Sequence, residues 1–537
     1  MHTKFVVVLG SLMSGLGKGI VTSSILKMLS FYDYNVVPVK FDGYLNYDCG
    51  TMNPYRHGEV FVLDDSGEVD MDFGTYERFL NKSMSIDQSI TGGKLFSTII
   101  REERHGDFLG RDVQIIPHMT DHIISLLEGL ARKKRADVLV IEVGGTVGDI
   151  ENSYFVEAMR QLALKHRTVF VNLTYIPKLS AVGEQKTKPT QLAFRALLQT
   201  GITPNFVVCR SESKLEEHTI RKLALFTNLN QRRIIDDSDV ESIYEVPLSF
   251  MRQKFDELLI KDLELDKHKL NTKKLSSWKD VVSKIKNPKE SVTVAIVGKY
   301  TNLRDSYASV KEAIVHAGAW NGVSVKIKWI ESATLEGRGK INVLEDVDGV
   351  IVPGGFGKRG IEGKILAIRY AREHKMPYLG LCLGMQLMAV EYARNVCGLD
   401  GANSTEFEPK TKYNVIDLLP SQRNVKDKGG TMRLGAWKCK ILNRDSIAYR
   451  AYGKEIISER HRHRYEFNNK YRRLLESKGL RVTGTTMDGK LVELIEWPNQ
   501  FGIGTQAHPE LKSRPENPAP LFVAFIDASK RYKSAKK

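Results

Sequence analysis

The sequence predicts an α/β protein made of two doubly wound domains with mostly parallel sheets. Its 537 residues exceed what one ordinary hydrophobic core organises, so two domains are expected. An apolar strand at residues 5–9 leads into a Gly-rich loop and a helix-like run, and a fresh strand at residues 291–297 opens a second alternation of strands and helices. This alternation is typical of parallel sheets, whose functional sites lie at the carboxyl ends of the strands.

Composition narrows the class of protein. The net charge of +16 invites a nucleic-acid interpretation, but the basic residues are spread along the chain and polyphosphate ligands also require Lys and Arg. No apolar run approaches the roughly 20 residues that span a bilayer. The five cysteines are scattered and lack metal-ligand spacing. We therefore expect a cytoplasmic protein with reduced thiols and with neither a nucleic-acid nor a membrane partner.

The first Gly-rich loop, residues 10–19, predicts a phosphate-binding site. Successive backbone N–H groups and the following helix N-terminus can surround phosphate oxygens, and Lys18 can neutralise their charge. The match to the G-x-x-x-x-G-K-[ST] loop is imperfect, because Leu12 stands where its first Gly is expected and Gly19 replaces the hydroxyl residue that binds magnesium. Carboxylates elsewhere are therefore expected to hold Mg²⁺.

Two acidic residues are candidates for that role. Asp72 lies in a strand-like alternation, residues 69–73, that places it on the same face as Asp70, and Glu142 ends an apolar strand at residues 138–142. Carboxylates near strand ends beside a phosphate loop suit a hard cation. From the residues alone, a pair of solvated surface acids fits as well.

Further polar groups follow along the first domain. Lys186 and Lys188 are two residues apart, in a segment whose backbone is restricted by Pro189, so both ammonium groups can meet one triphosphate. An ordinary exposed loop fits the same pattern. Arg210 ends the strand at residues 206–210, where its guanidinium can stack on an adenine ring.

The second domain contains a candidate nucleophile, Cys382, between Gly380 and Gly384. Small residues must flank a nucleophile on a tight strand-to-helix turn, and the helix N-terminus favours a thiolate there. Downstream, His508 and Glu510 are two residues apart and face one side of an extended segment. Nucleophile, proton carrier and orienting anion form a triad, whereas an isolated cysteine is more often a buried structural residue.

A second Gly-rich turn in this domain is a candidate oxyanion hole. The Gly354-Gly355 turn can present an N–H group beside that of Leu383, where it would stabilise a tetrahedral intermediate.

Residues 261–290 are strongly charged and are interpreted as a linker that contains a helix. The predicted domains are therefore residues 1–265 and 291–537, joined by residues 266–290.

Several of these motifs resemble known families. Residues 352–357, 380–386 and 508–510 resemble a class I glutamine amidotransferase domain with a triad-type Cys, and residues 14–19, 144–151 and 186–191 resemble the P-loop-like amidoligase domain of the CTP synthase family. The resemblance covers almost the whole chain. It implies ATP-dependent amination of UTP to CTP, the final step of de novo pyrimidine nucleotide synthesis, through phosphorylation of the UTP C4 oxygen and with ammonia from glutamine. It also implies Mg²⁺, activation by GTP, feedback by CTP, and a homotetramer that forms filaments in several members.

The resemblance assigns residues to each ligand. The triad is Cys382, His508 and Glu510; the metal ligands are Asp72 and Glu142; and His57 lies at the passage for ammonia. ATP is expected to contact Gly15, Leu16, Gly17, Lys18, Gly19, Ile20, Lys40, Asp72, Arg210, Asp239 and Val240. UTP and CTP are expected to contact Ser14, Asp149, Ile150, Glu151, Lys186, Thr187, Lys188, Pro189, Thr190, Gln191 and Lys222. Glutamine is expected to contact Gly355, Leu383, Gly384, Met385, Gln386, Glu406 and Arg464, and the lid associated with GTP is residues 429–435.

Two other functions remain open from the sequence. One is another glutamine-dependent amidoligase, acting on a carboxylate of a cobalamin or biotin precursor, which the segments at residues 144–151 and 186–191 argue against. The other is a catalytically silent regulatory or filament-forming protein, which the triad and Lys18 argue against.

Overall fold

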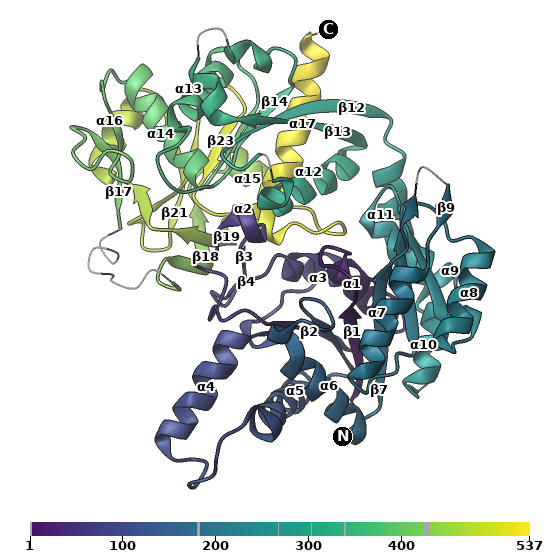
Figure 1. Ribbon diagram of the computed structural model, residues 1–537. Coiled ribbons are helices and arrows are strands. Elements are labelled where there is room, and N and C mark those ends of the chain that lie inside the picture. Colours follow the sequence, from purple (N-terminus) through teal and green to yellow (C-terminus); the bar gives the residue numbers. More distant parts are fainter. Residues whose placement is uncertain are drawn as a thin grey trace. The chain divides into compact units, whose positions relative to one another are not determined.

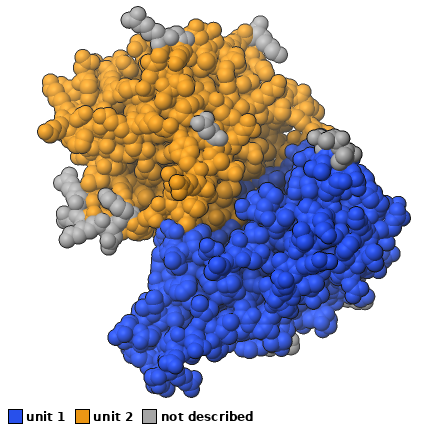
Figure 2. All heavy atoms as spheres, viewed as in Figure 1, with its two compact units in different colours: residues 1–48, 75–282 blue, residues 49–74, 283–537 orange. Residues whose placement is uncertain are grey.

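A computed structural model describes residues 3–179, 183–266, 268–301, 303–337, 340–419, 422, 425 and 429–536. The chain divides into two compact units, coloured separately in Figure 2: unit 1 is Met1–Asp48 with Thr75–Val282, and unit 2 is Cys49–Gly74 with Ser283–Lys537. The segment at residues 49–74, predicted as part of the first domain, therefore packs with unit 2.

Unit 1 contains a seven-stranded sheet in which every pair of neighbouring strands is parallel (Figure 1). The strand order is β11-β10-β7-β1-β6-β2-β5. Their bounds are β1 (Lys4–Gly10), β2 (Val36–Asp42), β5 (Ser89–Thr91), β6 (Val138–Val143), β7 (Thr168–Tyr175), β10 (Phe206–Ser211) and β11 (Ile234–Ser238). Phe5, Val6, Val7 and Val8 are all fully buried, as expected for a central strand that is covered on both faces.

The helices of unit 1 connect these strands. They are α1 (Lys18–Ser30), α4 (Gly92–His105), α5 (Thr120–Lys134), α6 (Ser153–Lys165), α7 (Lys188–Gln199), α8 (Glu217–Thr227), α9 (Val246–Arg252) and α10 (Phe255–Asp262), while α3 (Asp72–Leu80) and α11 (Thr272–Lys286) each run from one unit into the other. A short hairpin, β8 (Lys178–Leu179) with β9 (Glu184–Gln185), precedes α7. Helix α11 lies in the predicted linker, and its Trp278 is fully buried against Phe79 and Tyr244. The charged segment is thus partly anchored in the core of unit 1.

Unit 2 contains a nine-stranded mixed sheet in the order β13-β12-β14-β15-β23-β22-β21-β18-β19. The bounds are β12 (Glu290–Gly298), β13 (Val323–Glu331), β14 (Gly349–Val352), β15 (Tyr378–Leu381), β18 (Arg433–Ile441), β19 (Ile456–His463), β21 (Arg481–Thr486), β22 (Val492–Glu496) and β23 (Gly502–Thr505). From β13 to β23 the neighbours are parallel, as predicted, and from β23 to β19 they are antiparallel. The motifs of the sequence did not indicate this antiparallel half.

Helices cover both faces of this sheet. Ala295 and Val297 of β12 pack in one core with α13 (Ile361–Glu373) and α14 (Leu383–Asn395), whereas Val294 and Ile296 pack in another with α12 (Ala308–Asn321) and α17 (Pro520–Lys536). Alternate residues of one strand thus face two helical layers, which is the doubly wound arrangement. Shorter elements of unit 2 are α2 (Pro54–His57), β3 (Phe61–Val62), β4 (Glu68–Val69), α15 (Ile447–Tyr452), α16 (Arg472–Ser477), β16 (Asn403–Ser404), β17 (Asn414–Leu418) and β20 (Tyr465–Phe467).

Two partly buried ion pairs fasten the segment at residues 49–74 to the rest of unit 2. Nε of Arg460 donates to Asp64 at 2.7 Å, and Nε of Arg462 donates to Glu68 at 2.8 Å. Both arginines come from β19 at the edge of the sheet, so the β3–β4 hairpin is held beside that edge. Among the described residues, no helix is long and apolar enough to cross a membrane.

Candidate active site

Cys382 lies between β15 and α14 on a strained turn. Its φ of 52° and ψ of −100° are unusual for a residue other than glycine, and such strain is typical of functional turns. A Cβ atom at Gly380 would lie 2.7 Å from backbone carbon of Gly384, and one at Gly384 would collide with the Val352 carbonyl oxygen. The close packing explains why both neighbours of the turn are glycines.

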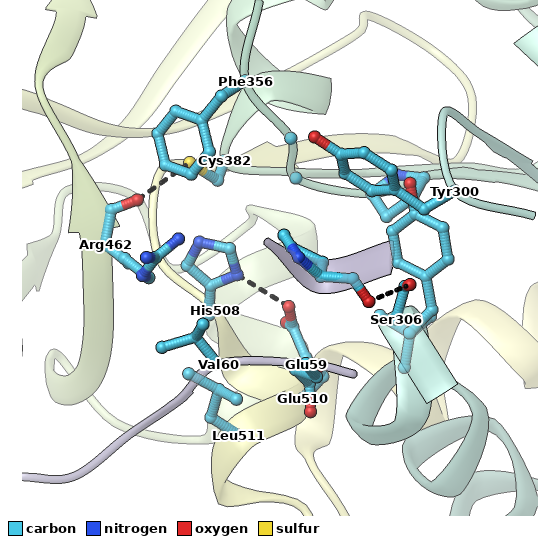
Figure 3. A pocket seen from close by; sticks show the side chains of 16 residues that line it. Glu59, Val60, Tyr300, Ser306, Phe356, Cys382, Arg462, His508, Glu510 and Leu511 are labelled. Atoms are coloured by element: carbon cyan, nitrogen blue, oxygen red, sulfur yellow. Dashed lines mark hydrogen bonds and ion pairs between the residues drawn. The ribbon is translucent and has the colours of Figure 1, made fainter. Parts of the chain in front are cut away.

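His508 and Glu510 meet directly beside this turn. Nδ1 of His508 lies 2.7 Å from Oε1 of Glu510, and Figure 3 shows the imidazole between the Cys382 thiol and the carboxylate. The backbone is not extended as predicted: residues 509–512 form a short 3₁₀ helix that begins at Pro509. Burial lowers the pKa of His508, but the charges of Glu510 and Cys382 and hydrogen bonds to both outweigh it and raise the pKa to about 10. The arrangement thus favours an imidazolium at neutral pH.

A cavity opens in front of the thiol (Figure 3). Apart from Cys382, His508 and Glu510, it is lined by Pro54, Glu59, Val60, Tyr300, Ser306, Tyr307, Val310, Pro353, Gly354, Gly355, Phe356, Arg462 and Leu511. Sγ of Cys382 lies 3.9 Å from the carbonyl oxygen of Arg462 and 3.6 Å from Nε2 of Gln506. The Cys382 thiol therefore has one acceptor and one donor next to it, besides the imidazole.

Two buried lysines hold the predicted oxyanion turn. Nζ of Lys364 donates to the Pro353 carbonyl at 3.1 Å, and Nζ of Lys299 donates to the carbonyls of Phe356, at 3.1 Å, and Gly357. Burial lowers the pKa of Lys299 to about 8 and places that of Lys364 well below its usual value. The turn comes close to the triad, since a Cβ at Gly354 would lie 2.9 Å from Cε1 of His508.

The sequence motifs did not single out these lysines. Lys299 directly follows the buried strand β12, so its position at a strand carboxyl end was the available signal. Lys364 is fully buried within α13, and only the three-dimensional packing reveals that position.

The residues predicted to contact glutamine fall into two groups. Gly355 lines the cavity, and Glu406 accepts a hydrogen bond from the N–H of Gly357 at 2.8 Å, with a pKa that burial raises. Leu383 and Met385, in contrast, lie in the hydrophobic core, so only their backbone is available to a ligand.

The other three residues predicted to contact glutamine are Gly384, Gln386 and Arg464, and each makes contacts within the protein. Gly384 gives the close helix–strand packing described above. Nε2 of Gln386 donates to the Tyr465 carbonyl at 2.9 Å and to Oε1 of Gln506 at 3.3 Å. The guanidinium of Arg464 donates to Gln422 and, at 2.9 Å, to the hydroxyl of Thr431.

The segment at residues 49–74 forms one wall of the cavity. Pro54, Glu59 and Val60 line it, and a carboxylate oxygen of Glu59 accepts from the backbone N–H of Ser309 at 3.1 Å and from its hydroxyl. His57, predicted to border the ammonia passage, is on α2 and is exposed.

The Gly-rich loop of unit 1 lies between β1 and α1. Leu12, Gly15 and Gly17 have φ values of 86°, 76° and 90°, so Leu12 adopts the left-handed conformation for which glycine is ordinarily used. Nζ of Lys18 donates to the carbonyl of Gly145 at 2.6 Å. Leu16 is buried, while Gly19 and Ile20 belong to the first turn of α1.

Lys40 and Glu142 are partners on the adjacent parallel strands β2 and β6, with Nζ and Oε1 3.5 Å apart. The hydroxyl of Tyr76 also donates to Glu142, which is almost fully buried. Asp72 is not on a strand as predicted: it begins α3, and its N–H donates to Oδ1 of Asp70 at 2.9 Å.

The two carboxylates suit Mg²⁺ by chemistry, since hard cations take oxygen ligands. They belong to different units, Glu142 to unit 1 and Asp72 to unit 2. Within the described ranges, no group of three or more His, Cys, Asp or Glu residues is arranged to hold a metal ion.

The predicted adenine site lies at the carboxyl ends of β10 and β11. The guanidinium of Arg210 forms an ion pair with Asp239 and donates to the Asp237 carbonyl at 2.9 Å. Val240 follows directly. The structure thus brings Arg210, Asp239 and Val240 together.

The predicted UTP residues divide into exposed and buried sets. Lys186 pairs with Glu184 at 2.6 Å, and the charge of Lys222 also helps to lower the pKa of Glu184, so the two lysines share one neighbourhood. Thr187, Thr190 and Gln191 are buried, and Nε2 of Gln191 donates to the Thr187 hydroxyl at 3.0 Å. The remaining members, Ser14, Asp149, Ile150, Glu151, Lys188 and Pro189, are exposed or half-buried.

Comparison with protein families defines the class of the chain. Residues 4–265 match the family model described as CTP synthase N-terminus, and residues 302–528 match the one described as glutamine amidotransferase class-I. With the fold and the cysteine turn of unit 2, these matches define a glutamine-dependent ligase. The same chain therefore carries a nitrogen-donating and a nitrogen-accepting half.

Full-length relatives specify the family. A CTP synthase of Caldanaerobacter subterraneus is 49% identical over 529 residues, covering 98% of both chains, and one of Pyrococcus abyssi is 50% identical over 539 residues, covering 99% of both. The chain belongs to the CTP synthase family. Another type of amidoligase is not favoured by these matches. Among solved structures, the glutaminase domain of Trypanosoma brucei CTPS with bound acivicin is 37% identical, covers 45% of this chain and 94% of its own, and has a TM-score of 0.43.

Proposed function

We propose that this chain converts UTP, ATP and glutamine into CTP, ADP, phosphate and glutamate, with the two halves of the reaction divided between the two α/β domains. The proposal is supported by the full-length similarity to CTP synthases and, above all, by one geometric observation. Cys382 lies at the N-terminus of α14 beside the imidazole of His508, which Glu510 holds at 2.7 Å.

The glutaminase half releases ammonia. The Cys382 thiolate attacks the carboxamide carbon of glutamine, and N–H groups of the Gly354-Gly355 turn and of Leu383 stabilise the oxyanion. His508 gives a proton to the leaving ammonia, and water then cleaves the thioester with His508 as general base. Gly355, Glu406 and Arg464 are the proposed determinants of glutamine binding. Ammonia would leave along the wall formed by residues 49–74, near His57.

The ligase half activates UTP. Transfer of the ATP γ-phosphoryl group to the C4 oxygen turns a poor leaving group into phosphate, which ammonia displaces. Lys18 and Lys40 are proposed to stabilise the transferring phosphoryl group, and Arg210 to stack on adenine. Lys186, Lys188 and Lys222 are the proposed ligands of the UTP triphosphate, with the segment at residues 149–151 and Ser14.

The proposal also includes a metal ion, nucleotide effectors, an oligomeric state and a cellular location. Glu142 and Asp72 would hold Mg²⁺, which supplies charge neutralisation to the phosphates. GTP as activator, CTP as feedback ligand, a homotetramer capable of filaments, and a cytoplasmic location follow from the family resemblance.

The test incubates the protein with UTP, ATP, Mg²⁺ and either glutamine or ammonium, and separates the nucleotides. We expect CTP from both nitrogen sources. CTP from ammonium alone would contradict the glutaminase assignment, and no CTP from either source would contradict the proposed reaction.

A further inference from the structure

Gln506 is a buried amide beside the nucleophile that the proposed reaction does not use. It directly follows β23, is fully buried, and its backbone N–H donates to the Glu493 carbonyl at 2.9 Å. Its side-chain Nε2 lies 3.6 Å from Sγ of Cys382. A primary amide donates through nitrogen and accepts through oxygen, so its orientation decides which charge state of the sulfur it favours.

Neighbouring groups fix that orientation. The carbonyl oxygen of Tyr465 can only accept, so the Gln386 side chain must present its nitrogen there, at 2.9 Å. The same nitrogen lies 3.3 Å from Gln506 and therefore faces the Gln506 oxygen. If Gln506 were turned over, two NH₂ groups would meet. The backbone carbonyl thus sets Gln386, and Gln386 sets Gln506 with its N–H towards the sulfur.

We propose that Gln506 is a positioning residue for the glutaminase reaction: its amide, locked by Gln386, holds Sγ of Cys382 and stabilises the thiolate over the thiol. The inference rests on the proposed role of Cys382 as nucleophile. A donor stabilises the charged acceptor more than the neutral one. The carbonyl of Arg462, 3.9 Å from the sulfur, can only accept and favours the protonated thiol, so the two contacts oppose each other.

Other titratable groups surround the thiol, and substitution of Gln506 leaves their identity unchanged. His508 and Glu510 lie on the turn after β23, Arg462 lines the same cavity, and the charge of Lys364 on α13 interacts with Cys382. Further titratable neighbours are Lys299, Glu331 and Glu406, whose charges act on Lys364, and the buried His461 and His463, on which the charge of His508 acts. A change in thiol titration that follows substitution of Gln506 alone is therefore assignable to its amide.

The test measures the rate at which iodoacetamide alkylates Cys382 as a function of pH, with modification quantified on the Cys382 peptide by mass spectrometry. Loss of one donor predicts that Gln506→Met moves the midpoint up by about one pH unit, so that the rate at pH 7 falls about tenfold. Gln506→Glu places an acceptor and a negative charge beside the sulfur and is expected to move the midpoint further. The matched control Gln500→Met, in the turn before β23, is expected to leave the profile unchanged.

An unchanged profile in Gln506→Met, with a urea unfolding midpoint equal to that of the unsubstituted chain, would overturn the proposal. If Gln506→Met does not fold, Gln386→Met decides, because it frees the Gln506 amide to rotate without removing it. An upward shift in that variant supports the proposal, and no shift refutes it. Failure of the proposed function is separate: it would appear as glutamine-dependent synthesis that survives Cys382→Ala.

Discussion

Nδ1 of His508 lies 2.7 Å from a carboxylate oxygen of Glu510, and this contact sets the charge of the imidazole next to Cys382. Burial lowers the pKa of His508, while Glu510 and Cys382 together raise it to about 10. The usual pKa of a histidine is near 6.5, so an ordinary imidazole loses its proton around that pH. With the raised pKa, the imidazole of His508 stays protonated up to about pH 10. The imidazolium form of His508 is therefore expected next to Cys382 at pH 7.

Glu510→Gln should reduce the protonation of His508. The neutral amide removes the main charge that raises the pKa of His508, so that pKa falls and less imidazolium is present beside Cys382 at pH 7. We expect glutamine-dependent synthesis to fall by roughly 10²–10⁴-fold, the usual contribution of a positioned acid–base group. Steady-state rates across pH 6–9 provide the measurement. Glu476→Gln, which removes an exposed partner of Arg472 on α16, is the control, and equal rates in the two variants would contradict the assignment.

Cys382→Ala should separate the two nitrogen sources. Without the nucleophile no thioester forms, so glutamine-dependent CTP synthesis should be lost while ammonium-dependent synthesis persists, because the ligase residues lie elsewhere. Product separation from the two assays gives the answer. Cys397→Ala, at a half-buried thiol in the same unit, should keep both routes. Loss of both routes in Cys382→Ala would refute the division of labour.

Lys18→Ala should abolish both nitrogen routes. Its ammonium group lies at the start of α1 over the Gly-rich loop, and its removal takes away a positive charge proposed to act on the phosphates. Cys382 should still be alkylated by a glutamine analogue in this variant, because that reaction needs the folded glutamine site of unit 2. Lys165→Ala, which removes an exposed partner of Asp121, should behave like the unsubstituted chain. Normal CTP synthesis by Lys18→Ala would exclude this loop as the ATP site.

The sequence predicted those parts of the fold and site whose chemistry is local. A nucleophile on a strand-to-helix turn needs glycines on both sides, and Gly380 and Gly384 carry that signal in the sequence itself. The strand-like interpretation of Asp72 was wrong because a five-residue alternation is short, and the Asp70 carboxylate instead accepts the first N–H of a helix. The extended interpretation of His508 and Glu510 was wrong as well, since Pro509 begins a 3₁₀ turn.

Contacts between distant residues explain what the sequence did not reveal. Asp64 and Arg460 are 396 positions apart, so no local pattern indicates that residues 49–74 pack with unit 2. The amide of Gln506 is similar, because its orientation depends on Gln386 and Tyr465, which lie on other elements. Sequence motifs predicted the candidate reacting residues, whereas the groups that hold these residues were visible only in the three-dimensional structure.

Glu68→Ala tests whether residues 49–74 support the glutaminase site. Glu68 is almost fully buried and accepts from Nε of Arg462, whose carbonyl contacts the Cys382 thiol and whose guanidinium lies 5.2 Å from the Phe356 ring centre. Removal of the carboxylate leaves a mostly buried guanidinium without this partner, which costs about 3–5 kcal/mol in such pairs. We therefore expect a lower free energy of unfolding in urea and a weaker glutaminase activity. Glu455→Ala breaks an exposed pair with Arg444 and should cost about 0–1 kcal/mol. Equal losses of stability in the two variants would show that the hairpin does not support β19. Normal glutaminase activity in a destabilised Glu68→Ala protein would show that Arg462 keeps its position without the Glu68 carboxylate.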